Sequence, residues 1–145
     1  MNPPEKRPGL LKRARHMLLE QHASPARLGL AVGIGVFVGL TPFYMLHALI
    51  AGGIAWALRL NIAAAALASQ ISNPFFAPGL IAASLWIGNA MGAGNSAHGA
   101  WDPSGLVFYV SWLRGGAVLG VVMGTALGLL TFAIARISRR RFRHA

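Results

Sequence analysis

Two short segments in the middle of the chain place polar side chains beside a proline inside long apolar runs. They are Thr41-Pro42-Phe43-Tyr44 and Asn73-Pro74-Phe75-Phe76, whose prolines lie 32 residues apart. Proline removes a backbone donor and leaves a carbonyl without its helical partner. At membrane depth such a break persists only where protein buries it or where it lines a wet cavity. Paired breaks of this kind are typical of transporter-like sites, where the ends of half-helices meet a substrate.

Polar side chains gather near both breaks, and in hydrocarbon each of them needs a partner, which pairing across the breaks would supply. His47 could titrate near neutral pH and relay a proton, or serve as a neutral hydrogen-bond donor. Arg59 could receive a phosphate headgroup or act only as an interfacial anchor. The alternative to a binding site is that the two kinks simply shape a bundle. The predicted ligand-binding set is Thr41, Pro42, His47, Arg59, Gln70, Asn73 and Pro74.

The remaining residue types argue against catalysis. The three acidic residues, Glu5, Glu20 and Asp102, lie outside the apolar runs, so they form no carboxylate pair for acid–base chemistry. The chain has no cysteine, and His98 with Asp102 supplies only two candidate metal ligands. We therefore expect no enzymatic activity, no catalytic residue, no metal and no cofactor.

Composition and charge place these residues in an all-α integral membrane protein. Of 145 residues, 55% are hydrophobic and 11% charged, whereas a soluble domain has about 45–50% and about 25%. Six Lys and Arg lie between Lys6 and Arg27, and five between Arg136 and Arg143. Because these basic clusters flank apolar runs, the net charge of +10 predicts membrane lipids as partners and no nucleic acid.

The charge distribution divides the chain into three parts. Residues 1–23 are expected to form a basic cytoplasmic leader, either an amphipathic helix on the membrane surface or an ordinary solvated helix. Residues 24–136 form the membrane domain, and Ser24-Pro25 has the residue types of a helix start. Residues 137–145 form a basic cytoplasmic tail. We expect no cleaved signal peptide.

Three uncharged runs make up the membrane domain. The run 28–58 has 31 residues, and Thr41-Pro42 divides it into halves of about 24 Å, shorter than the roughly 30 Å hydrocarbon core. The run 62–90 is expected to break at Asn73-Pro74 and again at Pro78. The run 115–135 has 21 residues and is the cleanest single span, with residues 105–113 near the outer interface.

Charge also predicts the topology. Under the positive-inside rule both termini are cytoplasmic, which requires an even number of crossings. We predict a re-entrant hairpin at 28–58 and about two full transmembrane spans, at 62–90 and 115–135. The alternative is four short, tilted segments. Either way, the chain is expected to be a multi-pass protein of the cell inner membrane.

Four glycines in the last run form a stripe suited to close helix packing. Gly116, Gly120, Gly124 and Gly128 recur every four residues, so they share one helix face. The neighbouring helix could belong to the same chain, to a second copy or to a membrane protein partner. A homo-oligomer or a partner protein is therefore expected.

Four segments together resemble the bacterial family called domain of unknown function 2062. They are Ser24-Pro25, GIGVFVGLTPFYMLHALIA, ALRLNIAAA and QISNPFFAPGL, and the match covers about residues 24–135. The resemblance implies a small inner-membrane protein of Gram-negative bacteria. Some relatives carry glycosyltransferase-like domains, which implies envelope polysaccharide or lipid-carrier work. The family supplies no catalytic residues.

Two functions follow as expectations. The first is a membrane-embedded binding or translocation module for a lipid-linked or small anionic ligand in envelope biogenesis, built on the two breaks. The second is a non-transporting structural or accessory protein that packs through its glycines against an envelope-biogenesis enzyme.

Overall fold

The computed structural model describes residues 24–43, 45–93 and 105–141, and within these ranges the chain forms helices and turns but no strand. The predicted all-α class is confirmed. The predicted leader helix in 1–23 lies outside the described residues. The elements are α2 (Pro25–Gly39), α3 (His47–Ala57), α4 (Ile62–Ala68), the 3₁₀ turn η1 (Ser69–Ser72), α5 (Ala77–Gly88), the π-helical turn η2 (Asn89–Ala93) and α6 (Leu106–Arg141).

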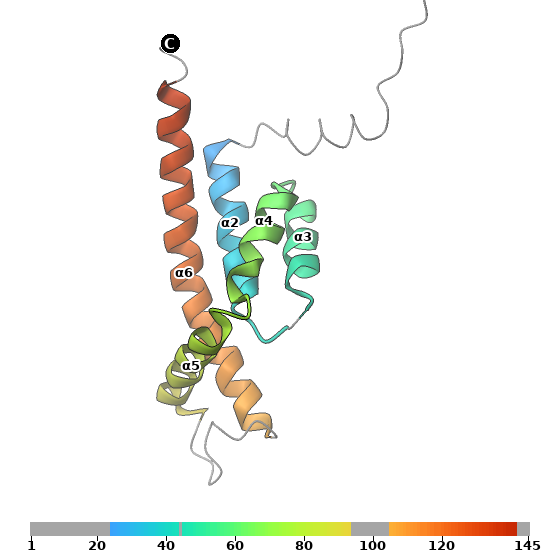
Figure 1. Cartoon of the computed structure of the whole chain (residues 1–145), viewed down its shortest axis with the longest axis vertical. Helices are drawn as coiled ribbons and strands as arrows, with labels where there is room; N and C mark the ends of the chain where they lie inside the picture. Colours follow the sequence, from blue (N-terminus) through green and yellow to red (C-terminus); the bar gives the residue numbers. More distant parts are fainter. Residues whose placement is uncertain (1–23, 44, 94–104, 142–145) are drawn as a thin grey trace, which may run out of the picture.

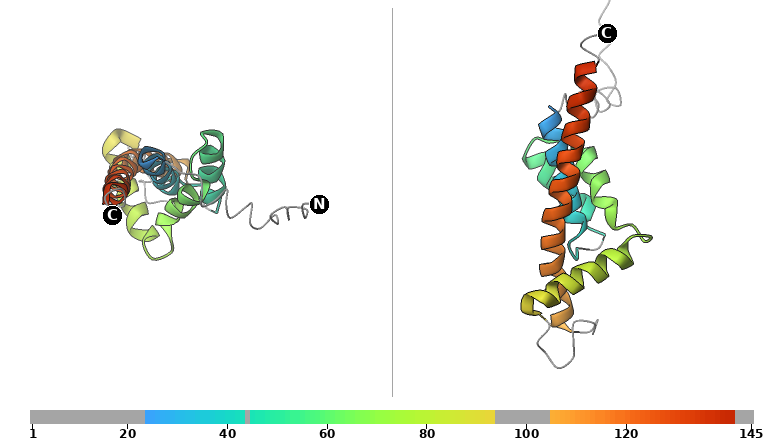
Figure 2. Two further views of the ribbon diagram at one scale, coloured as in Figure 1. Left: turned by 90° about the horizontal axis from the view of Figure 1, so that it is seen from above. Right: turned by 90° about the vertical axis from the view of Figure 1, so that its left-hand side faces the viewer.

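Helix α6 is the long axis of the molecule, and the other helices lie along it (Figure 1). Helix α2 packs beside the C-terminal half of α6, and α5 crosses the N-terminal half. Helices α3 and α4 lie on the side of α2 away from α6. Figure 2 shows the molecule from above, looking along α6, and from a further side, where α6 is again the long axis.

The first proline break reverses the chain. Helix α2 begins at Ser24-Pro25, where the Ser24 hydroxyl accepts a hydrogen bond from the Arg27 amide at 3.3 Å. It ends at Gly39. Pro42 has no amide hydrogen to donate to a helical carbonyl, and it disfavours the helical backbone conformation at Thr41. Helix α3 then runs back, so the start of α2 and the end of α3 lie at the same end of the molecule (Figure 1).

The second proline break bends the chain. The axis turns by 80° between Ile62–Ser72 and Ala77–Gly92. Asn73 takes the extended conformation that a following proline favours, and its Oδ1 accepts from the Phe75 and Phe76 amides at 3.0 and 3.1 Å. The prediction of a further break at Pro78 is wrong. Pro78 lies in the first turn of α5, where a helix needs no amide donor from it.

Helix α6 starts earlier than the sequence predicted. It has 36 residues, about 54 Å, and includes residues 106–113, which we had expected to lie apart from the span. The chain from Leu106 to Leu113 has no proline or glycine, and the side chain of Arg114 is exposed, so nothing interrupts the helix. Its residues Leu106–Arg139 are long and apolar enough to cross a membrane, and the bent pair would add a second crossing if it counts as one span.

Small side chains fill the interior and large apolar ones face outward. The buried core consists of Ala31, Val38, Ala51, Ala55, Leu60 and Ala65. By contrast, Leu49, Trp56 and Leu67 are exposed by 73%, 73% and 74%. A soluble domain buries its largest apolar residues instead. This distribution is the one expected of helices that pack closely in an apolar surrounding.

Glycines set the distance between α2 and α6, which run antiparallel. A Cβ atom placed on Gly29 would lie 2.5 Å from the Gly128 carbonyl oxygen, and one on Gly33 would lie 2.9 Å from that of Gly124. Three glycines of the α6 stripe contact α2 in this way, and the fourth contacts the residue after it: Gly120 faces Phe37, Gly124 faces Gly33, Gly128 faces Gly29 and Gly116 faces Leu40. The neighbour of this stripe is therefore another helix of the same chain.

Candidate functional site

The two proline breaks meet at one junction. The hydroxyl of Ser72, at the end of η1, donates a hydrogen bond to the carbonyl of Gly39 at the end of α2. A Cβ atom on Gly39 would lie 2.5 Å from the Ser69 carbonyl oxygen, so the two backbones are in direct contact. Segments that are 33 residues apart in sequence are thus held together where each helix stops.

Thr41 and His47 close the first break. The Thr41 hydroxyl donates to the Val38 carbonyl at 2.6 Å, and His47 Nε2 lies 2.8 Å from the Thr41 carbonyl oxygen. A carbonyl oxygen only accepts, so Nε2 must carry the proton in this contact. Both side chains are buried. Since His47 is the first residue of α3, its imidazole ties the start of α3 to the end of α2.

The junction encloses a space of about 10 Å³, lined in part by Thr41, His47, Ser72, Ser84 and Trp112. The Ser84 hydroxyl is buried and has no hydrogen-bond partner within the described part of the chain. A space of this size is about that of one water molecule, and Gly39, Leu40, Ala77, Leu80 and Ile81 also line it. As it stands, the junction has no room for a substrate.

The other predicted site residues lie apart from this space. Gln70, Asn73 and Pro74 are exposed, and Asn73 uses its side-chain oxygen to cap the turn that follows it. Pro42 is half-buried at the junction. Arg59 lies in the turn between α3 and α4, at the opposite end of α3 from the junction (Figure 1). A ligand-binding role for the set stays a prediction, and the structure gathers only part of it in one place.

Arg59 has an unusual backbone conformation for its residue type. Its φ is 54°, in the left-handed region. The Arg59 amide bonds the Trp56 carbonyl at 3.0 Å and the Leu60 amide bonds the Ala55 carbonyl at 2.7 Å, which is the hydrogen-bond pattern of a Schellman cap. Glycine usually occupies this position, because a Cβ atom costs about 1–2 kcal/mol there. The exposed Arg59 side chain borders a surface hollow of about 560 Å³ beside Trp56.

Replacing Arg59 with glycine should therefore stabilise the fold by about 1 kcal/mol. Thermal unfolding of the purified protein in detergent measures this as a rise in Tm of a few degrees. Arg59→Ala is the matched control, because it removes the guanidinium but keeps the Cβ atom. Equal Tm values for the two variants would show that the left-handed backbone carries no such cost.

The crossing of α5 and α6 is the closest helix contact, and the sequence analysis missed it. A Cβ atom on Gly115 would overlap the Ser84 carbonyl oxygen, and one on Gly88 would overlap that of Ser111. Ser111 is fully buried. Ser84 with Gly88, and Ser111 with Gly115, are both pairs of small residues four apart, a spacing typical of close helix packing in membranes. That spacing was the available sequence signal.

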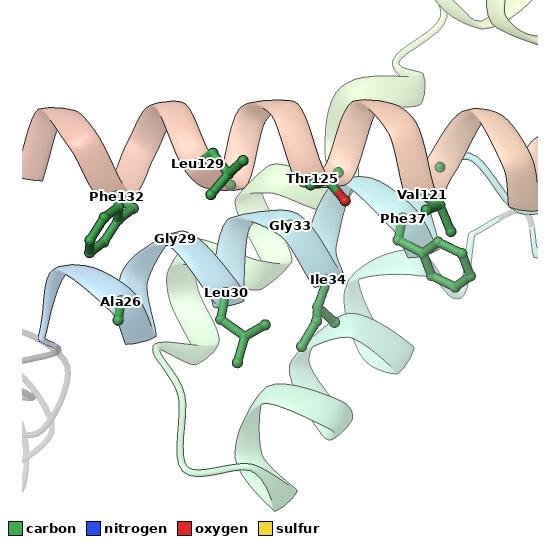
Figure 3. Close-up of a pocket in the computed structure, with 13 residues that line it drawn as sticks. Ala26, Gly29, Leu30, Gly33, Ile34, Phe37, Val121, Thr125, Leu129 and Phe132 are labelled. Atoms are coloured by element: carbon green, nitrogen blue, oxygen red, sulfur yellow. The ribbon is translucent and has the colours of Figure 1, made fainter.

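Another hollow runs along the contact between α2 and α6, and we call it the α2–α6 groove (Figure 3). Its volume is about 550 Å³. Glycine backbone forms its floor, and apolar side chains from both helices form its walls. The lining residues are Ala26, Gly29, Leu30, Gly33, Ile34, Phe37, Gly120, Val121, Gly124, Thr125, Gly128, Leu129 and Phe132. Among the described residues, no group of His, Asp or Glu could hold a metal ion.

The described residues form an all-helical protein with proline-broken helices, an interior rich in glycine and alanine, and large apolar side chains turned outward. The chain belongs to the family described as uncharacterized protein conserved in bacteria (DUF2062), whose family model matches residues 9–144. The resemblance seen in residues 24–135 is thereby confirmed and extends toward both ends. No curated protein and no solved structure matches the chain significantly.

Proposed function

We propose that the protein is a membrane-embedded helical module that binds an anionic, lipid-linked ligand of the bacterial envelope and catalyses no reaction. One observation carries this proposal. The start of α2, the turn between α3 and α4 and the end of α6 lie at the same end of the molecule (Figure 1), and they contain Arg27, Arg59 and Arg136. No acidic residue is present in 24–43, 45–93 or 105–141. An anionic headgroup would complement this basic end.

The dimensions of α6 fit a bilayer. Arg114 and Arg136 are 22 residues apart, about 33 Å along the helix, close to the roughly 30 Å of hydrocarbon. Beyond Arg114, the ring of Phe108 packs against Tyr109 and Trp112 with centroids 5.6 and 5.8 Å apart. Aromatic residues of this kind are enriched at membrane interfaces. In this placement one interface lies near Arg136 and the other near Arg114.

The same placement supports a re-entrant hairpin. Helix α2, about 22 Å long, would enter from the basic side and end at the level of Gly116, about 3 Å along α6 from Arg114, and α3 would return. The bent pair Ile62–Ser72 and Ala77–Gly92 would be the outward span and α6 the return. Both termini would then face the cytoplasm at the inner membrane. In hydrocarbon, every broken helix end needs internal partners, and the hydrogen bonds of Ser72 and His47 provide them.

A second candidate function is packing against an envelope-biogenesis enzyme. It is favoured by the outer faces of α3 and α4, where Leu49, Trp56 and Leu67 are nearly three-quarters exposed. Such side chains could contact either lipid or a partner helix. Changing these three residues to alanine should leave lipid binding intact under the first proposal and release a bound partner under the second.

Cysteine accessibility tests the membrane placement directly, because the chain has no native cysteine. Single cysteines at Ser24, Arg59, Met91 and Ser138 would be treated with a membrane-impermeant maleimide in spheroplasts. Only Met91 should be labelled before the membrane is opened. Labelling of Arg59 from outside would overturn the hairpin, and recovery of the protein in the soluble fraction after carbonate washing would overturn the membrane placement itself.

A further inference from the structure

We propose that the α2–α6 groove is a specific site for an anionic phospholipid of the cytoplasmic leaflet. One acyl chain lies in the groove, and the phosphate binds Arg27 and Arg136 at its end. This inference rests on the proposed membrane placement, and it adds the site, the chemical class of ligand and the leaflet. The exposed arginines face no acid within the described part of the chain.

The floor of the groove suits a hydrocarbon chain. Gly29 and Gly33 of α2 contact Gly128 and Gly124 of α6 through backbone atoms, so backbone lies against backbone at these positions. The walls are apolar, and Thr125 contributes the one side-chain hydroxyl of the lining. The volume of about 550 Å³ lies within the roughly 300–1,000 Å³ of ligand pockets. Figure 3 shows the groove-lining side chains arranged along the two helices.

The length of the groove matches one leaflet. Its lining on α2 extends from Ala26 to Phe37, eleven residue steps or about 16 Å. Half of a hydrocarbon core of roughly 30 Å is about 15 Å. On α6 the lining runs from Phe132 to Gly120, so a chain seated in the groove would begin near the basic interface and reach past the middle of the bilayer.

Two arginines stand at the basic end of the groove. On α6, Arg136 follows the groove residue Phe132 by four positions and so continues the same helix face. Its guanidinium lies 5.8 Å from the centre of the Phe132 ring, close enough for a cation–π contact. On α2, Arg27 precedes Leu30 by three positions and shares its face. Guanidinium groups bind phosphate oxygens with strong charge-assisted hydrogen bonds.

Charge favours a lipid over a second copy of the chain as occupant. Two copies in one membrane share the same orientation, so a second α2 or α6 in the groove would bring its own arginines to the same depth. Like charges placed together across an interface oppose association. A lipid phosphate at that depth brings the opposite charge.

Native mass spectrometry of the full chain in detergent tests the site, with phosphatidylglycerol and phosphatidylcholine titrated separately. Phosphatidylglycerol should bind at least about tenfold more tightly. The double variant Arg27→Gln, Arg136→Gln should lose that preference, since about 1.4 kcal/mol of charge-assisted bonding corresponds to tenfold. Arg114→Gln, an exposed arginine at the other end of α6 and outside the groove lining, is the matched control and should keep the preference.

The groove itself is tested by Thr125→Phe, which fills it from an exposed wall position, against Val122→Phe, an exposed position on α6 that does not line it. Thr125→Phe should weaken phosphatidylglycerol binding about tenfold, and Val122→Phe should not. Equal binding by these two variants, or an unchanged lipid preference in the double arginine variant, overturns the site even if the protein is embedded as proposed. Failure of membrane insertion would instead overturn the proposed function.

Discussion

Gly115→Ala is expected to destabilise the protein by about 3 kcal/mol, a loss on the order of 10 °C in Tm. The added methyl group would overlap the Ser84 carbonyl, which is backbone and cannot rotate away. Relief requires α5 to move off α6, which would separate Gly88 from Ser111 as well. Gly88→Ala should act in the same direction, because its methyl group would overlap the Ser111 carbonyl.

Two glycines that face open space, one in α3 and one in α5, provide matched controls. A Cβ atom on Gly53 of α3 or Gly79 of α5 meets no atom within 4 Å. Alanine at these positions should raise stability by about 0.5–1 kcal/mol through helix propensity. Thermal unfolding followed by size-exclusion chromatography compares all four variants. A Tm for Gly115→Ala at or above the wild-type value would show that the helices do not cross this closely.

His47→Leu is expected to cost about 1–3 kcal/mol, the penalty for leaving a buried carbonyl without a partner. Leucine keeps an apolar side chain of comparable bulk but cannot donate to the Thr41 carbonyl, which His47 Nε2 reaches at 2.8 Å. The Ser72 bond to Gly39, which joins the two breaks, would remain. Unfolding in detergent should show the loss as a lower Tm.

A rescue variant separates hydrogen bonding from packing at this position. The amide of His47→Gln carries an N–H donor at about the same reach as Nε2, so it should recover part of the lost stability. His47→Leu and His47→Gln should therefore differ in Tm, with glutamine the higher. Equal values would show that the imidazole acts through its volume and not through its proton.

Both proline breaks were predictable because their cause is local. Pro42 and Pro74 lack an amide donor and restrict the residue before them, and these effects hold in any surrounding. Pro78 has the same chemistry but lies in a first helical turn, where it does no harm. The predicted break at Pro78 was wrong because it depends on where α5 begins, and tertiary contacts help to set that boundary. The early start of α6 was missed because Arg114 indicated the boundary of the span. A charged residue changes the polarity of the segment there, but it does not end the helix.

The junction was predictable in principle but not in its partners. Polar groups near the breaks were expected to pair. Ser72 does bond across to the first break, at Gly39, and His47 bonds Thr41 within the first break. Both bonds end on backbone carbonyls, which no residue type in the sequence identifies. Gln70 and Asn73 were placed in the same set, yet the bend leaves them exposed. The left-handed conformation of Arg59 could not be predicted from the sequence either, because the residue type that normally indicates this conformation is glycine.

The pairing of α2 with α6 has a consequence for the order of synthesis. Gly29 contacts Gly128, a partner 99 positions later in the chain. At about 5–20 residues per second, α2 leaves the ribosome roughly 5–20 s before the end of α6 that covers its glycines. During this interval the smooth face of α2 has no helix of its own chain to meet. In the proposed membrane placement, translation speed over the second half of the message should therefore set how long the nascent chain depends on the insertion machinery.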